Sequence, residues 1–386
     1  MKTVRRKLGL LVRLSMTAAA LLMGQQAMAL GTDPGVDVDN TALVDYEVNG
    51  VGQTQVPSTT ASFVVDRRVD FTVTRMGIAL TPTTLGALAV DSPVAGNYLD
   101  FYVTNLSNGD LDFNLLFTQL ASGFGEIYPP GPGTADTDVD MNNVRIRVSS
   151  AIDPAGSPGT GPEPLLADDA YIDNLPEDRS IRVRLYADTP AALANTDVAG
   201  LSLDASAADP TGTVALPGAN LLESGIWNQG TVDNVFADNG NDNAESDVDG
   251  FDVTAPDLTV AKAASIVAPG TRALPGERIE YLITIDNTGG ADAATNISIG
   301  DLIDDDVTFV PDAYNGGSSN IVFDQGLAAE SFCNADDAGD TDGDGCSISL
   351  APITLTIAGR NAAGDAIDVA AGAIVTVRFQ VEIPAL

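Results

Sequence analysis

The sequence predicts an all-β protein built from two tandem β-sandwiches, and two observations support this prediction. Apolar and polar residues alternate in short runs such as Leu99–Thr104 and Tyr281–Ile285, and such alternation is typical of a strand with one buried face. Turn residues follow these runs at Asn108-Gly109 and Gly289-Gly290. Because no long helical period occurs after residue 29, short strands with frequent turns favour sandwiches.

Residues 1–29 have the parts of a secretory signal peptide. A positively charged start precedes the short apolar run Leu14–Gly24 and the small residues of Ala27-Met28-Ala29, which predict cleavage before Leu30. The uncharged run is shorter than the ~20 residues that a membrane-spanning helix needs. We therefore expect export, cleavage, and no membrane span in the mature chain.

An internal repeat divides the mature chain. Three pairs of segments match in the same order: Asp70–Val73 with Asp257–Val260, Leu99–Asn114 with Tyr281–Asn296, and Ile181–Pro190 with Val375–Pro384. Matches at similar offsets predict two homologous units. We place a first sandwich at residues 67–200 and a second at residues 255–386.

A fourth pair of segments is arranged differently. Val38–Tyr46 resembles Ala194–Leu203, which follows the first unit, whereas no copy follows the second unit. We call this repeated segment the tail block. Residues 30–66 then form an N-terminal strand segment, and residues 201–254 hold tail-block strands and an acidic connection. The order along the chain is therefore tail block, first unit, tail block, second unit.

This register has a physical consequence if the tail block supplies strands that complete a sandwich. The second sandwich would then have an open edge, and open edges pair readily with other strands. Segment 30–66 could insert into the second sandwich of a neighbouring molecule and extend head to tail into a filament; its candidate assembly residues are Val38, Asn40, Ala42, Val44 and Tyr46. Two alternatives stay open: the segment packs on its own first unit, or a shortened sandwich is stable alone.

Part of the second unit resembles a known family. The segments Pro256–Lys262, Leu274–Tyr281, Ile285–Gly290 and Ala294–Ser298 are similar to the bacterial surface-protein repeat called domain of unknown function number eleven, most clearly over residues 256–310. The resemblance implies tandem Ig-like β-sandwich domains in a secreted or cell-wall protein, without catalytic residues. The acidic insertion at residues 333–346 departs from the family pattern.

That insertion is bracketed by Cys333 and Cys346, the two cysteines of the chain. In an exported protein this placement predicts a disulfide. Inside it, alternating carboxylates followed by Gly345 are typical of the opening of a calcium loop, and the candidate ligands are Asp336, Asp337, Asp340, Asp342 and Asp344. An EF-hand is excluded because Ala351 stands where that motif needs a glutamate. The alternative is a solvated acidic turn held by the disulfide.

A second acidic stretch, Asp238–Gly250, is a weaker calcium candidate that we place in the connection between the units. Its candidate ligands are Asp238, Asp242, Asp247 and Asp249, and the alternative is a polar loop. The stretch Asp136–Asp140 is weaker again.

Composition excludes several functional classes. The chain of 386 residues has 54 acidic and 18 basic residues, a net charge of −36. Five basic and no acidic residues lie in 1–29, so the mature chain carries −41, which argues against nucleic-acid binding. The chain has no histidine, which removes the usual activator of a serine nucleophile. Lys262, the one lysine after residue 29, lies in a strand-like run.

The sequence therefore predicts a secreted, non-enzymatic structural protein of a bacterial cell surface or extracellular matrix, with a filament subunit as its most specific form. The alternative is a calcium-dependent adhesin that recognises a glycan or a protein. Expected partners are further copies of the chain or other surface proteins and glycans, and Ca²⁺ is the one candidate cofactor. The periplasm is the alternative location.

Overall fold

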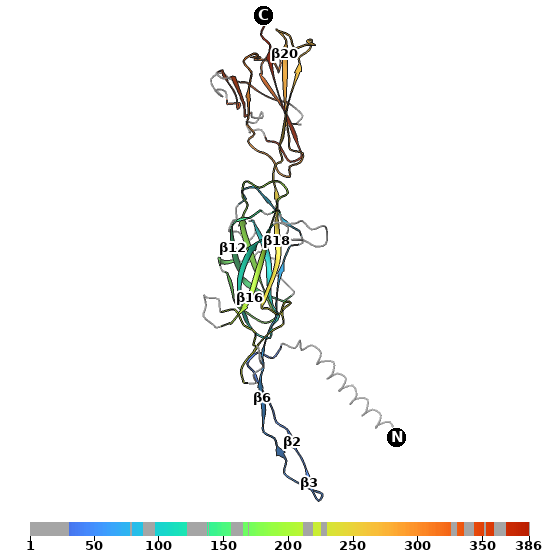
Figure 1. Ribbon diagram of the computed structural model, residues 1–386, viewed down its shortest axis with the longest axis vertical. Coiled ribbons are helices and arrows are strands. Elements are labelled where there is room, and N and C mark those ends of the chain that lie inside the picture. Colours follow the sequence, from blue (N-terminus) through green and yellow to red (C-terminus); the bar gives the residue numbers. More distant parts are fainter. Residues whose placement is uncertain are drawn as a thin grey trace, which may run out of the picture.

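The computed structural model describes residues 31–385 except 78, 88–96, 122–136, 138, 156–164, 169, 211–218, 225–229, 326–329, 336–342, 351–352 and 359–367. Within these residues all regular structure is β-strand, which confirms the all-β prediction. No helix in the described part of the chain could cross a membrane. The signal-peptide segment 1–29 lies outside the described residues. Figure 1 shows an N-terminal hairpin in blue, a first sandwich in the middle and a second sandwich in orange and red at the other end.

The first sandwich is made of two five-stranded sheets. One sheet has the order β13–β12–β15–β10–β8, with bounds β13 Leu165–Asp168, β12 Asn142–Pro154, β15 Arg179–Asp188, β10 Tyr98–Asn105 and β8 Phe71–Arg75. The other has the order β14–β11–β16–β18–β9, with bounds β14 Tyr171–Leu175, β11 Leu111–Gln119, β16 Val198–Ala208, β18 Ala244–Thr254 and β9 Thr81–Thr84. A short parallel pair, β7 (Arg67–Val69) and β17 (Asn234–Phe236), lies beside them.

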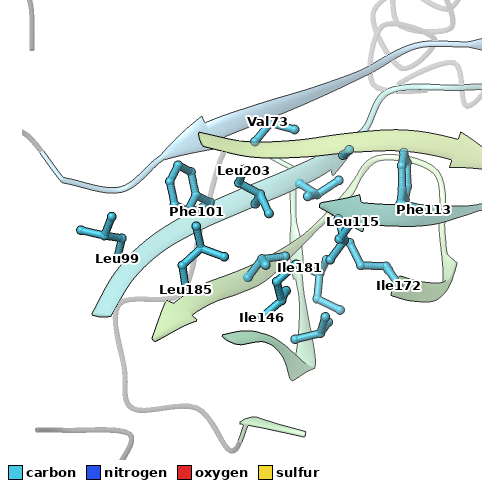
Figure 2. Packing of buried hydrophobic residues seen from close by; sticks show 14 of the residues in the cluster. Val73, Leu99, Phe101, Phe113, Leu115, Ile146, Ile172, Ile181, Leu185 and Leu203 are labelled. Atoms are coloured by element: carbon cyan, nitrogen blue, oxygen red, sulfur yellow. The ribbon is translucent and has the colours of Figure 1, made fainter. Parts of the chain in front are cut away.

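One hydrophobic core joins the two sheets of the first sandwich (Figure 2). Leu99, Phe101 and Val103 point into it from β10, which is the face that the alternation predicts. Phe113 enters from the opposite sheet and packs against Phe71 of β8, with the ring centroids 5.0 Å apart and the ring planes tilted by 58°. The core therefore depends on both sheets, and β16 and β18 contribute to it.

The second sandwich has a larger and a smaller sheet. The larger has the order β19–β20–β27–β23–β24, and β22 also pairs with β27; the bounds are β19 Thr259–Ile266, β20 Arg278–Asp286, β27 Ile374–Glu382, β23 Ile321–Asp324, β24 Ser331–Cys333 and β22 Thr308–Phe309. The smaller has the order β21–β26–β25, with bounds β21 Ile299–Leu302, β26 Ile353–Ile357 and β25 Cys346–Leu350. A second hydrophobic core lies between them.

One sheet of the first sandwich and the larger sheet of the second repeat the same strand order. β8, β10, β15 and β12 are neighbours in the order in which β19, β20, β27 and β23 are neighbours. The register agrees as well, because Val73 lies opposite Val103 as Val260 lies opposite Ile285. The segments that match in sequence therefore occupy the same strands.

A buried asparagine confirms the equivalence in detail. Asn105, at the end of β10, donates its Nδ2 hydrogen to the Leu175 carbonyl oxygen at 2.9 Å. Asn287, which follows β20, donates to the Val369 carbonyl oxygen at 3.1 Å. Both asparagines are fully buried. An equivalent asparagine thus ties the end of the equivalent strand to β14 in the first unit and to the isolated bridge residue Val369 in the second.

The sheets that face these two differ in their strands. β11 lies between β14 and β16, whereas its counterpart β21 pairs with β26 and with no other described strand. No described strand of the second sandwich corresponds to β16 or β18. We expected Asp238–Gly250 to connect the units, but residues from Ala244 onward belong to β18 and pair with β16. The acidic stretch thus ends inside the first sandwich.

The N-terminal segment forms one long hairpin that projects from the first sandwich (Figure 1). Its strands are β1 Asp37–Asn40, β2 Leu43–Val44, β3 Glu47–Val48, β4 Val51–Gly52, β5 Val56–Pro57 and β6 Ala61–Val64. The tip is Asn49-Gly50, where φ is 53° and 75°, as a tight hairpin turn with left-handed residues requires. At the base, the Asn108 Nδ2 donates to the carbonyl oxygens of Thr32 and Asp66, both at 3.0 Å, and fixes both arms to the sandwich.

Candidate assembly site

The hairpin has one apolar face and one polar face. Val38 lies opposite Phe63, Val44 opposite Val56, and Val48 opposite Val51, and paired residues share a face. The other face carries the acidic residues Asp37, Asp39, Asp45 and Glu47, together with Leu43. Apart from the half-buried Val38 near the base, the apolar face is exposed, with Val44 at 56% and Val51 at 63%.

A contiguous apolar face in water indicates an interaction surface. A two-stranded hairpin is also marginally stable by itself in water. Its residues between the base and the tip contact no other described part of the chain closely enough to become buried. The hairpin therefore has the properties of a segment that gains stability when another surface covers it.

The hydrogen bonds at its base relate this hairpin to the pair β16–β18. Val65 N–H donates to the Val36 carbonyl oxygen at 2.9 Å, as Val253 N–H donates to the Asp197 carbonyl oxygen at 2.8 Å. Two residues further on, Val38 lies opposite Phe63 as Ala199 lies opposite Phe251. The structural register thus aligns Val38 with Ala199, whereas the sequence match had placed it near Ala194.

In this register the five candidate assembly residues take core positions. Val38, Asn40, Ala42, Val44 and Tyr46 correspond to Ala199, Leu201, Leu203, Ala205 and Ala207. These five residues of β16 face the first core and are at most 1% exposed. The five candidate residues of the hairpin are instead exposed, apart from Val38, which is half-buried.

The second sandwich has an exposed face where the first is covered. Val73 is 7% exposed and Phe71 is fully buried, because β18 lies beside β8. Their counterparts are Val260 on β19, which is 66% exposed, and Leu258, which directly precedes β19 and is 39% exposed. The side chains of β19 are exposed along the strand up to Ser265. The open side of the second sandwich therefore runs along β19 and along the free edge of β21.

An ion pair crosses this open side. Lys262 Nζ, on β19, lies 2.8 Å from Oδ1 and 2.6 Å from Oδ2 of Asp301, on β21. The ammonium also lies 4.2 Å from the centroid of the Tyr281 ring, a cation–π contact. Lys262, the one lysine that follows residue 29, thus lies between the two strands that border the open side.

The predicted disulfide is confirmed. Cys333 and Cys346 are bonded and buried, and they join β24 of the larger sheet to β25 of the smaller sheet. The Asp344 carboxylate accepts hydrogen bonds from Asn334 N–H at 2.6 Å and Cys346 N–H at 3.0 Å. The other four candidate ligands, Asp336, Asp337, Asp340 and Asp342, lie outside the described residues. The calcium loop therefore stays a prediction.

The weaker calcium candidates are spread over a turn and a strand. Asp238 Oδ1 accepts a hydrogen bond from Asp242 N–H at 3.2 Å in the turn before β18. Asp247 and Asp249 lie two residues apart on β18, and Asp247 Oδ2 accepts from Arg75 N–H at 2.8 Å. None of the four belongs to a group of three ligand atoms within 4.8 Å among the described residues. One such group, Asp304–Asp306, is exposed and was not among the candidates that the sequence predicted.

Comparison with known proteins identifies no family. No family model matches the chain, and no curated protein matches it, so the resemblance to domain of unknown function number eleven stays a prediction. Solved structures give matches at low similarity. A family 123 glycoside hydrolase from Clostridium perfringens matches with 11% identity and a TM-score of 0.24, over 48% of this chain and 27% of that chain.

Two matches cover more of the chain. The C-terminal domain of the AgI/II polypeptide BspA from Streptococcus agalactiae matches with 9% identity and a TM-score of 0.31, over 82% of this chain and 91% of that chain. The collagen adhesin CNA from S. aureus matches with 12% identity and a TM-score of 0.21, over 83% and 84%. At these TM-scores we draw no functional inference from the likeness.

Sequence reasoning missed half of the candidate site. Within segment 30–66 it named candidate residues on the first arm of the hairpin only, and none on the second arm, which carries Val51, Val56 and Phe63. The dipeptide Asn49-Gly50 was an available signal, because Asn-Gly between strand-like runs is typical of a hairpin turn. Leu258 and Val260 carried no such signal, since only the position of the neighbouring strands makes them exposed.

Proposed function

We propose that this protein is a secreted, non-enzymatic subunit of an extracellular filament that assembles head to tail. The N-terminal hairpin of one subunit occupies the open side of the second sandwich of the next subunit. Its first arm pairs with β21 as β16 pairs with β11, and its second arm covers β19 as β18 covers β8. The exposure of Val260, whose counterpart Val73 is buried, is the observation that supports this proposal.

The chemistry of the two surfaces is complementary. The hairpin offers an apolar face, and the second sandwich offers the exposed apolar residues Leu258 and Val260 with an unpaired strand edge. Burying one large apolar side chain fully contributes about 1.5–3 kcal/mol, so several such residues on the hairpin supply a substantial driving force. Main-chain hydrogen bonds along β21 add to it, as in other cases of strand addition.

The arrangement leads to a fibre rather than to a closed dimer. The hairpin and the open side belong to different ends of the elongated molecule (Figure 1). A contact between two different surfaces is heterologous, and it leaves one free hairpin and one free open side at the ends of every oligomer. Export through the segment 1–29 would place this assembly outside the cytoplasm.

Neighbouring residues of the hairpin give a matched test. Val44 and Leu43 are 56% and 58% exposed but lie on opposite faces. In the mature protein we expect Val44→Asp to abolish filaments in negative-stain images, and Leu43→Asp to leave them unchanged. Filaments that form equally well with Val44→Asp, or a parent protein that stays monomeric at high concentration, would contradict the proposal. Thermal unfolding of both variants provides the control for folding.

A further inference from the structure

The counterpart of Lys262 in the first sandwich is Arg75. Each stands two residues after the equivalent valines Val260 and Val73 and lies on the edge strand of its sheet. Both side chains are cationic, in a chain where basic residues are few. Arg75 therefore shows what a cation at this position contacts when two further strands, β16 and β18, complete the sandwich.

In the first sandwich Arg75 contacts β18, the strand that corresponds to the second arm of the N-terminal hairpin. Its Nη1 donates to the Val248 carbonyl oxygen at 3.0 Å, and its backbone N–H donates to Asp247 Oδ2 at 2.8 Å. Both acceptors belong to β18. A hydrogen bond from a charged donor to a backbone carbonyl positions the strand independently of its side chains.

In the second sandwich Lys262 faces the open side. Its ammonium contacts the Asp301 carboxylate, and its side chain is 40% exposed. An ammonium has three N–H donors, so an acceptor that arrives from the open side can be bound while Asp301 stays in place. Asp301 takes the position of Gln119 in the first sandwich, since β21 corresponds to β11. In the second sandwich the carboxylate beside the cation, Asp301, belongs to the sandwich itself, whereas in the first the nearby carboxylate, Asp247, belongs to β18 and accepts the Arg75 backbone N–H.

We propose that Lys262 is the residue of the open side that anchors the second arm of the incoming hairpin, through the carbonyl oxygen of Thr60. Val248 lies three residues before Phe251, and Thr60 lies three residues before its counterpart Phe63. Thr60 also lies beside Thr41, with their hydroxyl oxygens 3.0 Å apart, as Val248 lies opposite Ser202. This inference rests on the proposed filament and names the polar contact that sets its register.

The neutral charge of the incoming segment also suits the open side. The position of Asp247 is taken in the hairpin by Thr59, which is neutral. Because Asp301 already balances Lys262, a second carboxylate would place two negative charges beside one cation. The open side thus fits a hairpin with a neutral segment Ser58–Thr60, namely the one that a second copy of this chain presents.

The first test uses substitutions at Lys262 in the mature protein, with assembly followed by sedimentation over a range of concentrations. We expect Lys262→Met to raise the concentration at half-assembly by about 10-fold or more, and Lys262→Arg, the residue of the first sandwich, to restore assembly. Lys262→Met also leaves Asp301 without its cation. The double variant Lys262→Met with Asp301→Asn removes this problem and should stay impaired, whereas Asp301→Asn alone should assemble.

The second test uses chemical labelling of the lysine in the parent protein. Acetic anhydride should modify Lys262 in the monomer and much less in the filament. Equal modification of both forms, normal assembly of Lys262→Met, or equal impairment of Asp301→Asn and the double variant would overturn the role of Lys262. These outcomes leave the filament itself intact. The filament proposal fails separately, if Val44→Asp assembles like the parent.

Discussion

Val260 occupies in the second sandwich the position that Val73 occupies in the first, yet it is 66% exposed and Val73 is 7% exposed. Each lies opposite the equivalent residue of the neighbouring strand, Ile285 and Val103. The difference therefore arises from the strands that cover this position, because the described residues place a strand pair like β16–β18 over the first sandwich only.

The two valines should respond differently to truncation in the monomer. Val73→Ala removes buried methyl groups and should destabilise the first sandwich by about 1–3 kcal/mol. Val260→Ala should change the stability of the monomer little, because its side chain already contacts water. Chemical denaturation of both variants checks this expectation, and an equal loss for the two would show that Val260 is covered in solution.

The disulfide should stabilise the second sandwich alone. Cys333 and Cys346 are 13 residues apart, and a closed loop of about this size contributes roughly 3 kcal/mol in the chain-entropy model. Reduction with dithiothreitol should lower the melting temperature of one transition and leave that of the first sandwich unchanged. A single transition that shifts as a whole would instead indicate that the two sandwiches unfold together.

The buried asparagines should be costly to remove. Asn287 donates to the carbonyl oxygens of Asp292 and Val369 and accepts from Asp257 N–H at 2.9 Å. Asn287→Ala leaves these groups without their partner, at about 1–3 kcal/mol for each buried group that stays unsatisfied. Calorimetry should show the loss in the second sandwich, and Asn105→Ala should show it in the first. A loss below about 1 kcal/mol, the smallest cost expected for one unsatisfied buried group, would contradict this role of the asparagines.

The pH dependence of stability should have opposite signs at two carboxylates. Burial raises the pKa of Asp112, which Asp173 and Asp209 raise further despite the hydrogen bond from Asn174. A folded-state pKa above the unfolded value costs stability at neutral pH, and this cost disappears as the pH falls through that pKa. We therefore expect Asp112→Asn to raise the melting temperature at pH 7 and to lose this advantage in acid.

Asp286 provides the contrasting case. Hydrogen bonds from the Thr288 side chain and backbone lower its pKa, so its contribution to stability is present at neutral pH and is lost as the pH falls through the folded pKa. Asp286→Asn should lower the melting temperature at neutral pH and make no difference in strong acid. Melting curves of the two variants between neutral and acidic pH distinguish the signs, and parallel curves would refute the assignment.

The sequence carried much of the fold because strands and repeats leave local patterns. Alternation at Leu99–Val103 marks the buried face of β10, and the match of Asp70–Val73 with Asp257–Val260 identifies equivalent edge strands. The position of the two cysteines was enough to predict their bond. These features depend on residues that lie close together in the chain or that repeat in it.

The rest depends on long-range geometry that a single sequence does not display. Val38–Tyr46 resembles Ala194–Leu203 in sequence, but hydrogen bonds at Val65 and Val253 set another register. Val73 and Val260 are the same residue type in the same motif, so their exposure differs only because of strands far along the chain. The contact between Lys262 and Asp301 likewise joins edges of two different sheets.

Cross-linking between two differently marked subunits tests the proposed contact at residue level. The first sandwich pairs Thr118 with Ser202, and their counterparts are Gly300 of the open edge and Thr41 of the hairpin. A Cβ at Gly300 meets no atom within 4 Å, so a cysteine fits there. We mix subunits carrying Thr41→Cys with subunits carrying Gly300→Cys and oxidise them. The proposal predicts covalent dimers from this mixture and few from Asp45→Cys with Gly300→Cys, which lies about 13 Å further along the strand; no dimers, or equal amounts from both mixtures, would contradict it.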